Sequence, residues 1–530
     1  MMLGSVISSV SLRRCFYLSL MVFVLSTLMA MVIIVKLTPL ESSKCHSSNT
    51  GTTARVEWSS AMPFGSISHN RHLDNSSLFI NNLQSLILNN SDSQNEDQDI
   101  KNTDTRNKIT GLSWKMRSKI LPLLMINDTK QIDINYNIHI FYYPWYRSLA
   151  YDGVWKHWNH DYLPNWKKND KRIFPEGRHR PPADIGASYY PSIGCYSSND
   201  PQVIDLHMRQ LRETGVGVLV VSWTPPNIPD NTDSVMADLL DAAHRYNLKI
   251  APHIEPYPGR NPINLIQHIK YLFGHYASHP ALHRAKRNND GPLLPVIYIY
   301  DSYLFPSSAW WELLSERGNL TLRGTEIDAV YIGLLVDSQH RSHIKKSHFD
   351  GFYTYFAVNG FSYGSTWKNW KDLNKFAAQN GLIFIPSLGP GYIDTQVRAW
   401  NTENIRHRLH GQYYEVAWKN GINSGAKVIS ITSFNEWHEG TQIEPAKPVS
   451  NKDFTYLDYE PEGPNFYLNL TKWWIQQFSY KSISVLQNQE DRDERDRLHP
   501  KDFYTLQFDD HQRMTQLTAR HLSSNQMLGI

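Results

Sequence analysis

Val216-Gly217-Val218-Leu219-Val220-Val221 is the stretch of sequence that decides the fold. All of its residues are apolar, and no polar residue alternates with them. A strand with water on one face alternates between apolar and polar residues, whereas a parallel strand covered on both faces is almost continuously apolar. The stretch therefore predicts a buried parallel strand, which we expect to extend to Trp223.

The same theme, a short apolar run followed by a helical pattern, repeats along the middle of the chain. Eight such runs lie at 138–143, 216–223, 249–255, 296–301, 330–336, 351–356, 382–388 and 428–434. Apolar residues at helical spacing separate them, as in Ile204, Met208 and Leu211 after the capping sequence Asn199-Asp200-Pro201. Further helices are expected at 235–246, 262–273, 309–316, 367–378, 404–419 and 466–477. This order predicts an α/β protein with a (β/α)8 TIM barrel, and an open doubly wound sheet is the alternative.

The N-terminal segment has the composition of a membrane anchor. An apolar run at 15–35 follows Arg13 and Arg14 and is long enough to form a single transmembrane helix. A cleaved signal peptide is the alternative, but it has a shorter apolar region and a small-residue cleavage site, which the residues after 35 do not offer. Because arginines before a span stay in the cytoplasm, we expect 1–14 to be a cytoplasmic tail and the catalytic domain to be lumenal, in a single-pass type II topology.

The rest of the chain divides by composition. Residues 36–106 are rich in Ser, Asn, Asp and His and predict a disordered lumenal stem. The catalytic barrel is expected at 107–480, and the charged segment at 481–530 predicts a disordered extension. The formal net charge of +3 is spread along the chain, so nucleic acid is not an expected partner. Sequons that agree with entry into the secretory pathway lie at Asn75, Asn89, Asn127, Asn319 and Asn469.

Aromatic and polar residues follow the predicted strands. In a parallel barrel, the groups that contact substrate lie at and just after the C-terminal ends of the strands. These positions hold Tyr143, Trp223, His253, Glu255, Tyr257, Asp301 and Tyr355. Aromatic faces stack on the apolar side of a sugar ring, and carboxylates and histidines form hydrogen bonds with its hydroxyl groups. The pattern therefore favours a carbohydrate substrate.

The segment Asn435-Glu436-Trp437-His438-Glu439-Gly440 follows the eighth strand and carries two glutamates. Most glycosidases flank the scissile bond with two carboxyl groups, one that protonates the leaving oxygen and one that acts as base or nucleophile. Glu436 and Glu439 would point to opposite faces of a strand, so we expect the chain to turn helically after Phe434 and bring them together. Their mutual repulsion and the apolar wall of Trp437 should then raise the pKa of one of them.

These segments resemble glycoside hydrolase family 99, from about residue 138 to residue 474. The matching motifs are Phe141-Tyr142-Tyr143-Pro144-Trp145-Tyr146, His157-Trp158-Asn159-His160, His253-Ile254-Glu255-Pro256-Tyr257, Tyr300-Asp301-Ser302-Tyr303, Pro390-Gly391-Tyr392-Ile393-Asp394 and Asn435-Glu436-Trp437-His438-Glu439-Gly440-Thr441-Gln442-Ile443-Glu444. The resemblance implies a retaining endo-α-1,2-mannosidase of the Golgi membrane. It implies that the substrate is a glucosylated mannose unit of N-linked high-mannose glycans on glycoproteins.

The resemblance also implies a mechanism without a covalent glycosyl-enzyme. Glu436 would deprotonate the 2-hydroxyl of the substrate, which attacks the anomeric carbon and gives a 1,2-anhydro sugar. Glu439 would protonate the leaving oxygen and later activate water. The residues alone leave direct nucleophilic attack open. Sugar contacts are expected at Tyr143, Trp223, His253, Glu255, Tyr257, Asp301, Tyr355 and Trp437.

Two positions depart from the family pattern, and two other functions stay open. Ala399 stands where a proline is expected, and Arg147 follows the first aromatic motif where a small residue is expected, which puts the outer sugar of the substrate in doubt. One alternative is a metal-dependent hydrolase; its ligands would be His157, His160, His253, Glu255 and His438. The other alternative is a catalytically inactive glycan-binding protein. No HExxH-type spacing is present, and we expect neither a metal nor another cofactor.

Overall fold

The structure is a computed structural model that describes residues 132–165, 172–287, 290–452 and 454–487. The predicted cytoplasmic tail, anchor and stem lie outside these residues, as does most of the predicted C-terminal extension. Within the described residues, no helix is long and apolar enough to cross a bilayer.

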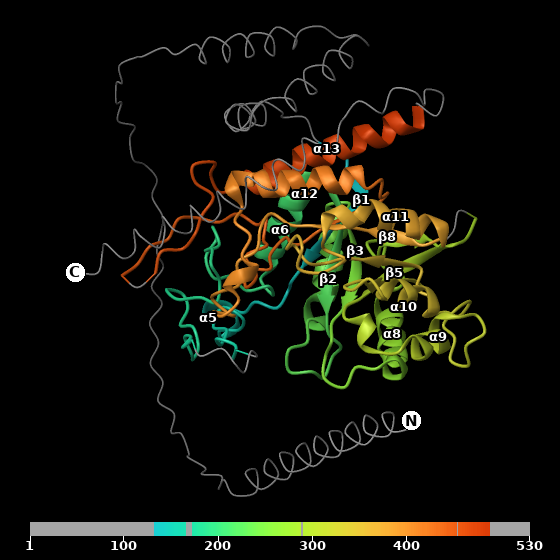
Figure 1. The fold of residues 1–530 in the computed structure, drawn as a ribbon. Coiled ribbons are helices and arrows are strands. Elements are labelled where there is room, and N and C mark those ends of the chain that lie inside the picture. The colour runs from blue at the N-terminus through green and yellow to red at the C-terminus, as the bar shows by residue number, and fades with distance from the viewer. Residues whose placement is uncertain (1–131, 166–171, 288–289, 453, 488–530) are drawn as a thin grey trace, which may run out of the picture. The chain divides into compact units, whose positions relative to one another are not determined.

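Parallel strands form the centre of the described part of the chain (Figure 1). They are β1 (Asn135–Tyr142), β2 (Val216–Trp223), β3 (Lys249–Ile254), β5 (Leu293–Ile299), β6 (Val330–Leu334), β7 (Gly351–Tyr353), β8 (Ile383–Ile385), β9 (Ser387–Leu388) and β10 (Ile429–Ile431). Their order in the sheet is β8-β7-β6-β5-β3-β2-β1-β10-β9. Every residue of β2 is buried, as its continuous apolar sequence predicts.

The two ends of this sheet belong to one predicted strand. The run at 382–388 is divided at Pro386, which has no N–H to donate to a strand ladder. The first part, β8, pairs with β7, and the second part, β9, pairs with β10. The strands therefore form a nearly closed parallel barrel that follows the order of the sequence. This arrangement favours the predicted TIM barrel over the open sheet.

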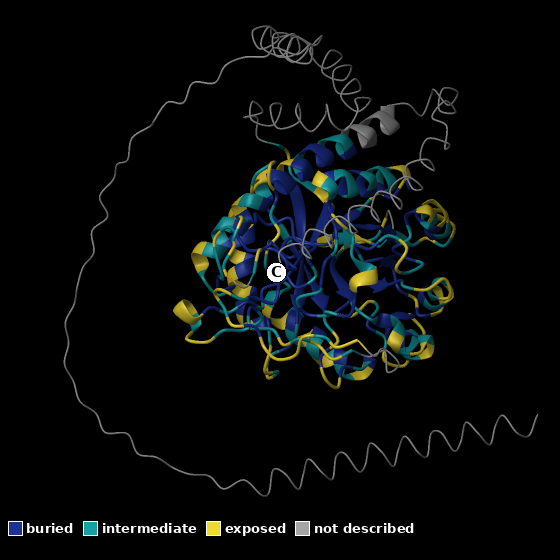
Figure 2. Cartoon of the chain, turned by 60° about the vertical axis from the view of Figure 1, so that its left-hand side comes forward, coloured by how far each residue is buried: buried dark blue, intermediate teal, exposed yellow. Residues whose placement is uncertain are grey.

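Helices surround the strands. Their bounds are α5 (Leu149–Asp152), α6 (Pro201–Thr214), α7 (Met236–Arg245), α8 (Pro262–Tyr276), α9 (Ser307–Leu314), α10 (His340–Lys346), α11 (Trp370–Gln379), α12 (Gln412–Asn423) and α13 (Phe466–Gln487). Figure 2 shows that buried residues face the strands and that the exposed ones lie on the outer surface. The predicted cap of α6 is present, since the side chain of Asp200 accepts a hydrogen bond from the backbone N–H of Gln202 at 2.9 Å.

Four elements differ from the prediction. The short helices α5 and α10 and the small strand β4 (Arg284–Lys286), antiparallel to β5, were not expected. The helix predicted at 404–419 begins only at Gln412, because His410 and Gly411 have left-handed φ values of 54° and 90° that a helix cannot contain.

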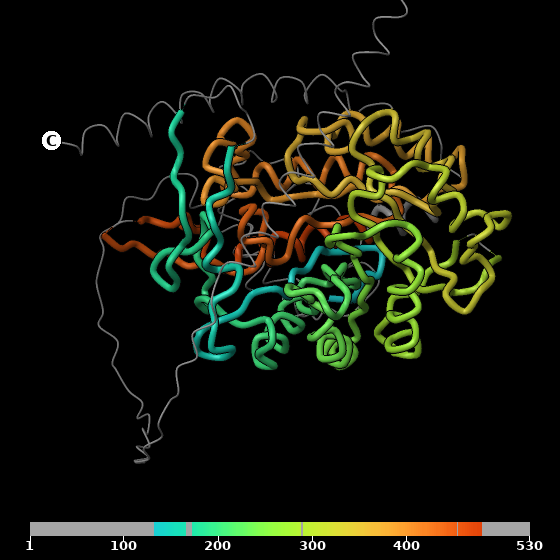
Figure 3. Tube along the Cα trace, turned by 90° about the horizontal axis from the view of Figure 1, so that it is seen from below, coloured from blue at the N-terminus to red at the C-terminus, as the bar shows by residue number. Residues whose placement is uncertain are grey.

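The first and last described segments of the barrel lie side by side. Figure 3 shows the first described residues, in cyan, beside the final helix, in orange-red. Asn135, the first residue of β1, donates a side-chain hydrogen bond to Ser479 of α13 at 2.8 Å. The chain therefore enters the barrel at the N-terminal ends of its strands.

Candidate active site

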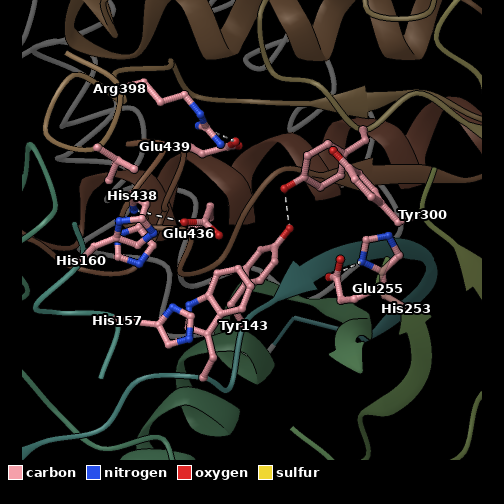
Figure 4. Close-up of a pocket in the computed structure, with 13 residues that line it drawn as sticks. Tyr143, His157, His160, His253, Glu255, Tyr300, Arg398, Glu436, His438 and Glu439 are labelled. Carbon is pink, nitrogen blue, oxygen red and sulfur yellow. Dashed lines mark hydrogen bonds and ion pairs between the residues drawn. The ribbon is translucent and has the colours of Figure 1, made fainter. Parts of the chain in front are cut away.

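A cavity of about 300 Å³ lies where the strands end. Residues from segments far apart in the sequence meet there, as Figure 4 shows. They are Tyr143, Trp145, His157, His160, His253, Glu255, Tyr300, Tyr355, Val397, Arg398, Glu436, His438 and Glu439. The structure thus brings together both predicted catalytic glutamates and four of the predicted sugar-binding residues: Tyr143, His253, Glu255 and Tyr355.

A tight turn brings the two glutamates to the same pocket. The N–H of Gly440 donates to the carbonyl of Trp437 at 3.2 Å, and Gly440 has a φ of 61° that disfavours other residues. A Cβ atom on Gly440 would also lie 2.8 Å from the carbonyl oxygen of Ile393. The expected change of direction after the eighth strand is therefore a glycine-dependent turn of the chain at 437–440.

Burial and mutual repulsion control the ionisation of the pair. Glu436 is 4% exposed, and burial, followed by the charge of Glu439, raises the pKa of Glu436 well above its usual range. The backbone N–H of His438 donates to Glu436 Oε1 at 3.1 Å and partly offsets this rise in the pKa. Burial raises the pKa of Glu439 to about 7. Because burial raises both pKa values, the pair can hold a proton at neutral pH.

Arg398 is the cation that faces this pair. Its Nη1 lies 3.7 Å from Glu439 Oε1, and it holds the pKa of Glu439 lower than burial alone would. The same Nη1 donates to Asp394 Oδ2 at 3.1 Å. Asp394 is buried and also accepts hydrogen bonds from Tyr392 and Asn401. Asp394 therefore holds the guanidinium of Arg398 in place, and Asp394 is itself held by Tyr392 and Asn401.

Two tyrosines form another part of the pocket wall. The hydroxyl groups of Tyr143 and Tyr355 are in hydrogen-bonding contact. Tyr355 has a φ of 53°, which is rare for a residue other than glycine, asparagine or aspartate. Its backbone N–H donates to Ser387 Oγ at 2.7 Å, and its carbonyl accepts from the hydroxyl of Thr432. These bonds hold Tyr355 in the strained conformation that turns its phenol toward Tyr143.

A third carboxylate lies across the pocket from the glutamate pair (Figure 4). Glu255 Oε1 is 3.3 Å from His253 Nδ1. The other ring nitrogen of His253 shares a hydrogen bond with the hydroxyl of Tyr353 at 2.7 Å. The ring of His253 is therefore held between two oxygen groups, and Glu255 is available to accept hydrogen bonds from a ligand.

Three histidines and a tryptophan line the remaining side. His157 stacks on Trp145 with ring centroids 4.7 Å apart, and burial lowers the pKa of His157 to about 3. Burial also lowers the pKa values of His160 and His438, so all three rings are neutral near pH 7. In the described part of the chain, no group of three or more His, Cys, Asp or Glu side chains is arranged to hold a metal ion. The histidines of the metal hypothesis share a pocket without forming a ligand set.

The other predicted sugar-binding residues do not line this cavity. The indole of Trp223 is buried and donates to Asp233 at 2.8 Å, and the hydroxyl of Tyr257 contacts His268. Asp301 accepts from its neighbour Tyr303 at 2.8 Å. Trp437 is fully buried, with its indole turned away from the pocket toward Glu444. The position after a strand identified these residues, but the direction of each side chain depends on the hydrogen-bond partner that it meets in the folded chain.

Several pocket residues were not predicted as sugar contacts. Trp145, Tyr300 and the three histidines lie in motifs that carried the family resemblance, and the histidines were also weighed as metal ligands. Nothing in the sequence pointed to Val397 and Arg398 as pocket residues, apart from the neighbouring Ala399, which stands where the family has a proline. Their loop is placed by Asp394, whose carbonyl accepts from the backbone N–H of Arg398 at 2.7 Å.

This barrel and pocket define a class of enzyme, the glycoside hydrolases, which place two carboxyl groups on either side of the glycosidic bond that they cleave. Residues 133–480 match the model of Glycosyl hydrolase family 99. The chain belongs to this family, as the motifs implied, and is a glycoside hydrolase.

Curated relatives and a solved structure agree with this assignment. The chain is 47% identical over 361 residues to the glycoprotein endo-alpha-1,2-mannosidase of Rattus norvegicus, covering 67% of this chain and 78% of that protein. It is 48% identical over 346 residues to the glycoprotein endo-alpha-1,2-mannosidase-like protein of Homo sapiens, covering 64% and 76%. The GH99 endo-alpha-mannosidase from Bacteroides thetaiotaomicron has 40% identity and a TM-score of 0.62, covering 66% of this chain and 99% of that one.

Proposed function

We propose that this chain is a retaining endo-α-1,2-mannosidase that removes a glucosylated mannose unit from N-linked high-mannose glycans. The observation that carries the proposal is the placement of Glu436 and Glu439 in one pocket, with pKa values raised by burial. The names of the relatives support the linkage, and the aromatic and histidine walls suit a sugar.

In the proposed first step, Glu436 takes the proton of the substrate's 2-hydroxyl. The resulting oxygen attacks the anomeric carbon, the bond to the leaving sugar breaks, and Glu439 donates its proton to the leaving oxygen. In the second step, Glu439 takes a proton from water, which opens the 1,2-anhydro sugar at the anomeric carbon, and Glu436 returns the first proton to the 2-oxygen. Two inversions at one carbon give net retention.

This sequence requires the proton of the pair to lie on Glu439 when substrate is bound. Burial raises the pKa of both glutamates, so either of them can hold this proton. A hydrogen bond from the 2-hydroxyl stabilises the ionised form of Glu436 and moves the proton in the required direction. The alternative is direct attack by a glutamate on the anomeric carbon, with a covalent intermediate. Trapping with a 2-deoxy-2-fluoro sugar separates the routes, since only direct attack leaves the sugar bound to a glutamate.

The decisive experiment is to incubate the full-length chain with a glucosylated high-mannose glycan. Release of an intact glucosylated disaccharide or larger unit is expected, because an endo-acting enzyme cuts behind the outer sugar. Release of single glucose or mannose would overturn the endo assignment. Activity that withstands a chelator is expected, and activity that returns only when a metal ion is added would support the metal-dependent alternative.

We also propose that the protein is a single-pass type II protein of the Golgi membrane, anchored by 15–35 with its catalytic barrel in the lumen. The apolar run and its preceding arginines support this topology. In sealed Golgi vesicles, an antibody epitope in the barrel should be protected from added protease until detergent is supplied. Cleavage of the epitope in intact vesicles would contradict the proposed topology.

A further inference from the structure

Glu444 is a buried carboxylate behind the pocket that has no part in the proposed reaction. It is 2% exposed and does not line the cavity. Two donors reach its Oε2, the hydroxyl of Tyr196 at 2.8 Å and the indole N–H of Trp437 at 2.9 Å. His207 Nε2 lies 3.1 Å from its Oε1. Such a set of donors stabilises a buried acceptor and is lost as a unit when the acceptor is removed.

One of these donors belongs to the residue after Glu436. The indole ring of Trp437 is fully buried, and an indole N–H can only donate, so it needs an acceptor such as a carboxylate. The backbone N–H of Trp437 donates to the hydroxyl of Tyr146 at 3.1 Å. Trp437 is therefore fixed at both its side chain and its backbone.

Another donor connects Glu444 to the residue before Glu436. The hydroxyl of Tyr196 accepts from the side-chain amide of Asn435 at 3.3 Å while it donates to Glu444. Asn435 exchanges two further bonds with the backbone of Tyr143, at 2.7 and 2.9 Å. The same side chain therefore links the carboxylate network to a pocket tyrosine.

We propose that Glu444 is a positioning residue that fixes the carboxylate of Glu436 by holding both of its neighbours, Asn435 and Trp437. The third donor extends this function to β1, because the other ring nitrogen of His207 pairs with the hydroxyl of Tyr142 at 2.9 Å. Tyr142 ends the strand that precedes Tyr143. Glu444 thus connects the turn that carries the glutamate pair to the strand that carries a pocket tyrosine. The inference rests on the proposed function of Glu436.

The experiment compares three variants with the full-length wild type on a glucosylated high-mannose glycan. Glu444→Ala removes the carboxylate acceptor of the Trp437 indole and leaves only its longer bond of 3.3 Å to the hydroxyl of Tyr196. The change should lower kcat about 100-fold with little change in KM, the size expected when a catalytic group is misplaced by about an ångström. Glu444→Gln can keep its oxygen on Trp437 if His207 changes tautomer, so it should retain most of the activity. Trp437→Phe removes the same hydrogen bond from the other side and should lower kcat in the same direction.

The double variant Glu444→Ala, Trp437→Phe tests whether the two residues act together. Its loss of kcat should be about that of Glu444→Ala alone, because both changes break one link. Asp350→Asn is the control, since Asp350 is another buried carboxylate, directly before β7. It should lower Tm without lowering kcat at a temperature where the variant is folded.

Three results would overturn the inference. They are a normal kcat in folded Glu444→Ala, losses that multiply in the double variant, and a loss in Asp350→Asn as large as that in Glu444→Ala. Cleavage by the wild-type chain tests the proposed function separately, because the inference depends only on ratios of variant to wild type. A crystal structure of Glu444→Ala gives a second readout: an unmoved carboxylate at Glu436 would contradict the positioning role.

Discussion

The two ends of the barrel treat buried carboxylates in opposite ways. At the N-terminal ends of the strands, Asp350 accepts two hydrogen bonds of 3.0 Å from Arg323 and lies 2.9 Å from Arg287. Asp328 contacts the same two guanidinium groups. Burial still raises the pKa of Asp350, but the arginines oppose that rise.

At the C-terminal ends of the strands, Glu436 and Glu439 have far less compensation. Arg398 lies 3.7 Å from Glu439, and Glu436 accepts a backbone N–H rather than a cation. Arginines neutralise the carboxylates at the first end, whereas at the second end the two glutamates repel each other. This fold therefore surrounds buried carboxylates with arginines at one end and leaves a carboxylate pair with raised pKa values at the other, and each prediction below tests one side of this division.

The largest effect on activity is expected from Glu439→Gln. An amide cannot donate the proton that the leaving oxygen needs, so kcat should fall about 1,000-fold, the middle of the range for a general acid. The shape of the pocket is retained, and calorimetry should find glycan binding close to that of the wild type. Glu316→Gln, on the exposed surface, is the control. Normal cleavage by Glu439→Gln would remove Glu439 from the reaction.

The next effect concerns pH. Glu439 must be protonated to act as acid, and burial raises its pKa to about 7, so activity should fall as the pH rises through about 7. Arg398→Met removes the positive charge that lowers this pKa, so the alkaline limb of the kcat profile should move to higher pH. Arg398→Lys keeps the charge and should leave the limb near its wild-type position. A limb that moves to lower pH in Arg398→Met would contradict the assigned electrostatics.

At the opposite end of the barrel, Arg323→Met should affect stability alone. The substitution leaves the carboxylates of Asp328 and Asp350 with one guanidinium, and breaking a buried ion pair costs about 3 kcal/mol. Thermal or denaturant unfolding measures the loss, and kcat at a temperature where the protein is folded should be unchanged. A change in the pH profile would mean that the two ends of the barrel are coupled.

The smallest effect is expected at Arg147, one of the departures from the family pattern. Its Nη1 donates to the backbone carbonyls of Pro144 and Tyr146, at 3.2 and 2.9 Å, and the residue does not line the cavity. Arg147→Gly should therefore change KM by less than about threefold, the size of one weak hydrogen bond. Comparison of glucosylated and mannosylated substrates is the sharper measurement. A reversal of preference would show that Arg147 contacts the outer sugar.

The barrel could be predicted because each strand has a recognisable local sequence pattern. A continuous apolar run such as β2 is stable only as a strand that is covered on both faces. The division at Pro386 and the late start of α12 depend on single backbone positions, and the helical pattern of 404–419 hides the left-handed residues that interrupt it.

The glutamate pair could also be located from sequence, since it follows the last strand. The directions of the side chains around it could not. Trp437 was expected at the sugar, but the buried carboxylate of Glu444 turns it into the core, and no local pattern specifies that partner. Arg398 was missed because its place depends on Asp394, which accepts bonds from residues in a folded loop.

The hydrogen bond between Asn135 and Ser479 has a consequence for how the enzyme can be held. The incoming chain and the last described helix meet where the strands begin, and the pocket opens where they end. The described part of the barrel therefore begins at the end remote from the pocket, so a support attached at this end leaves the opening accessible.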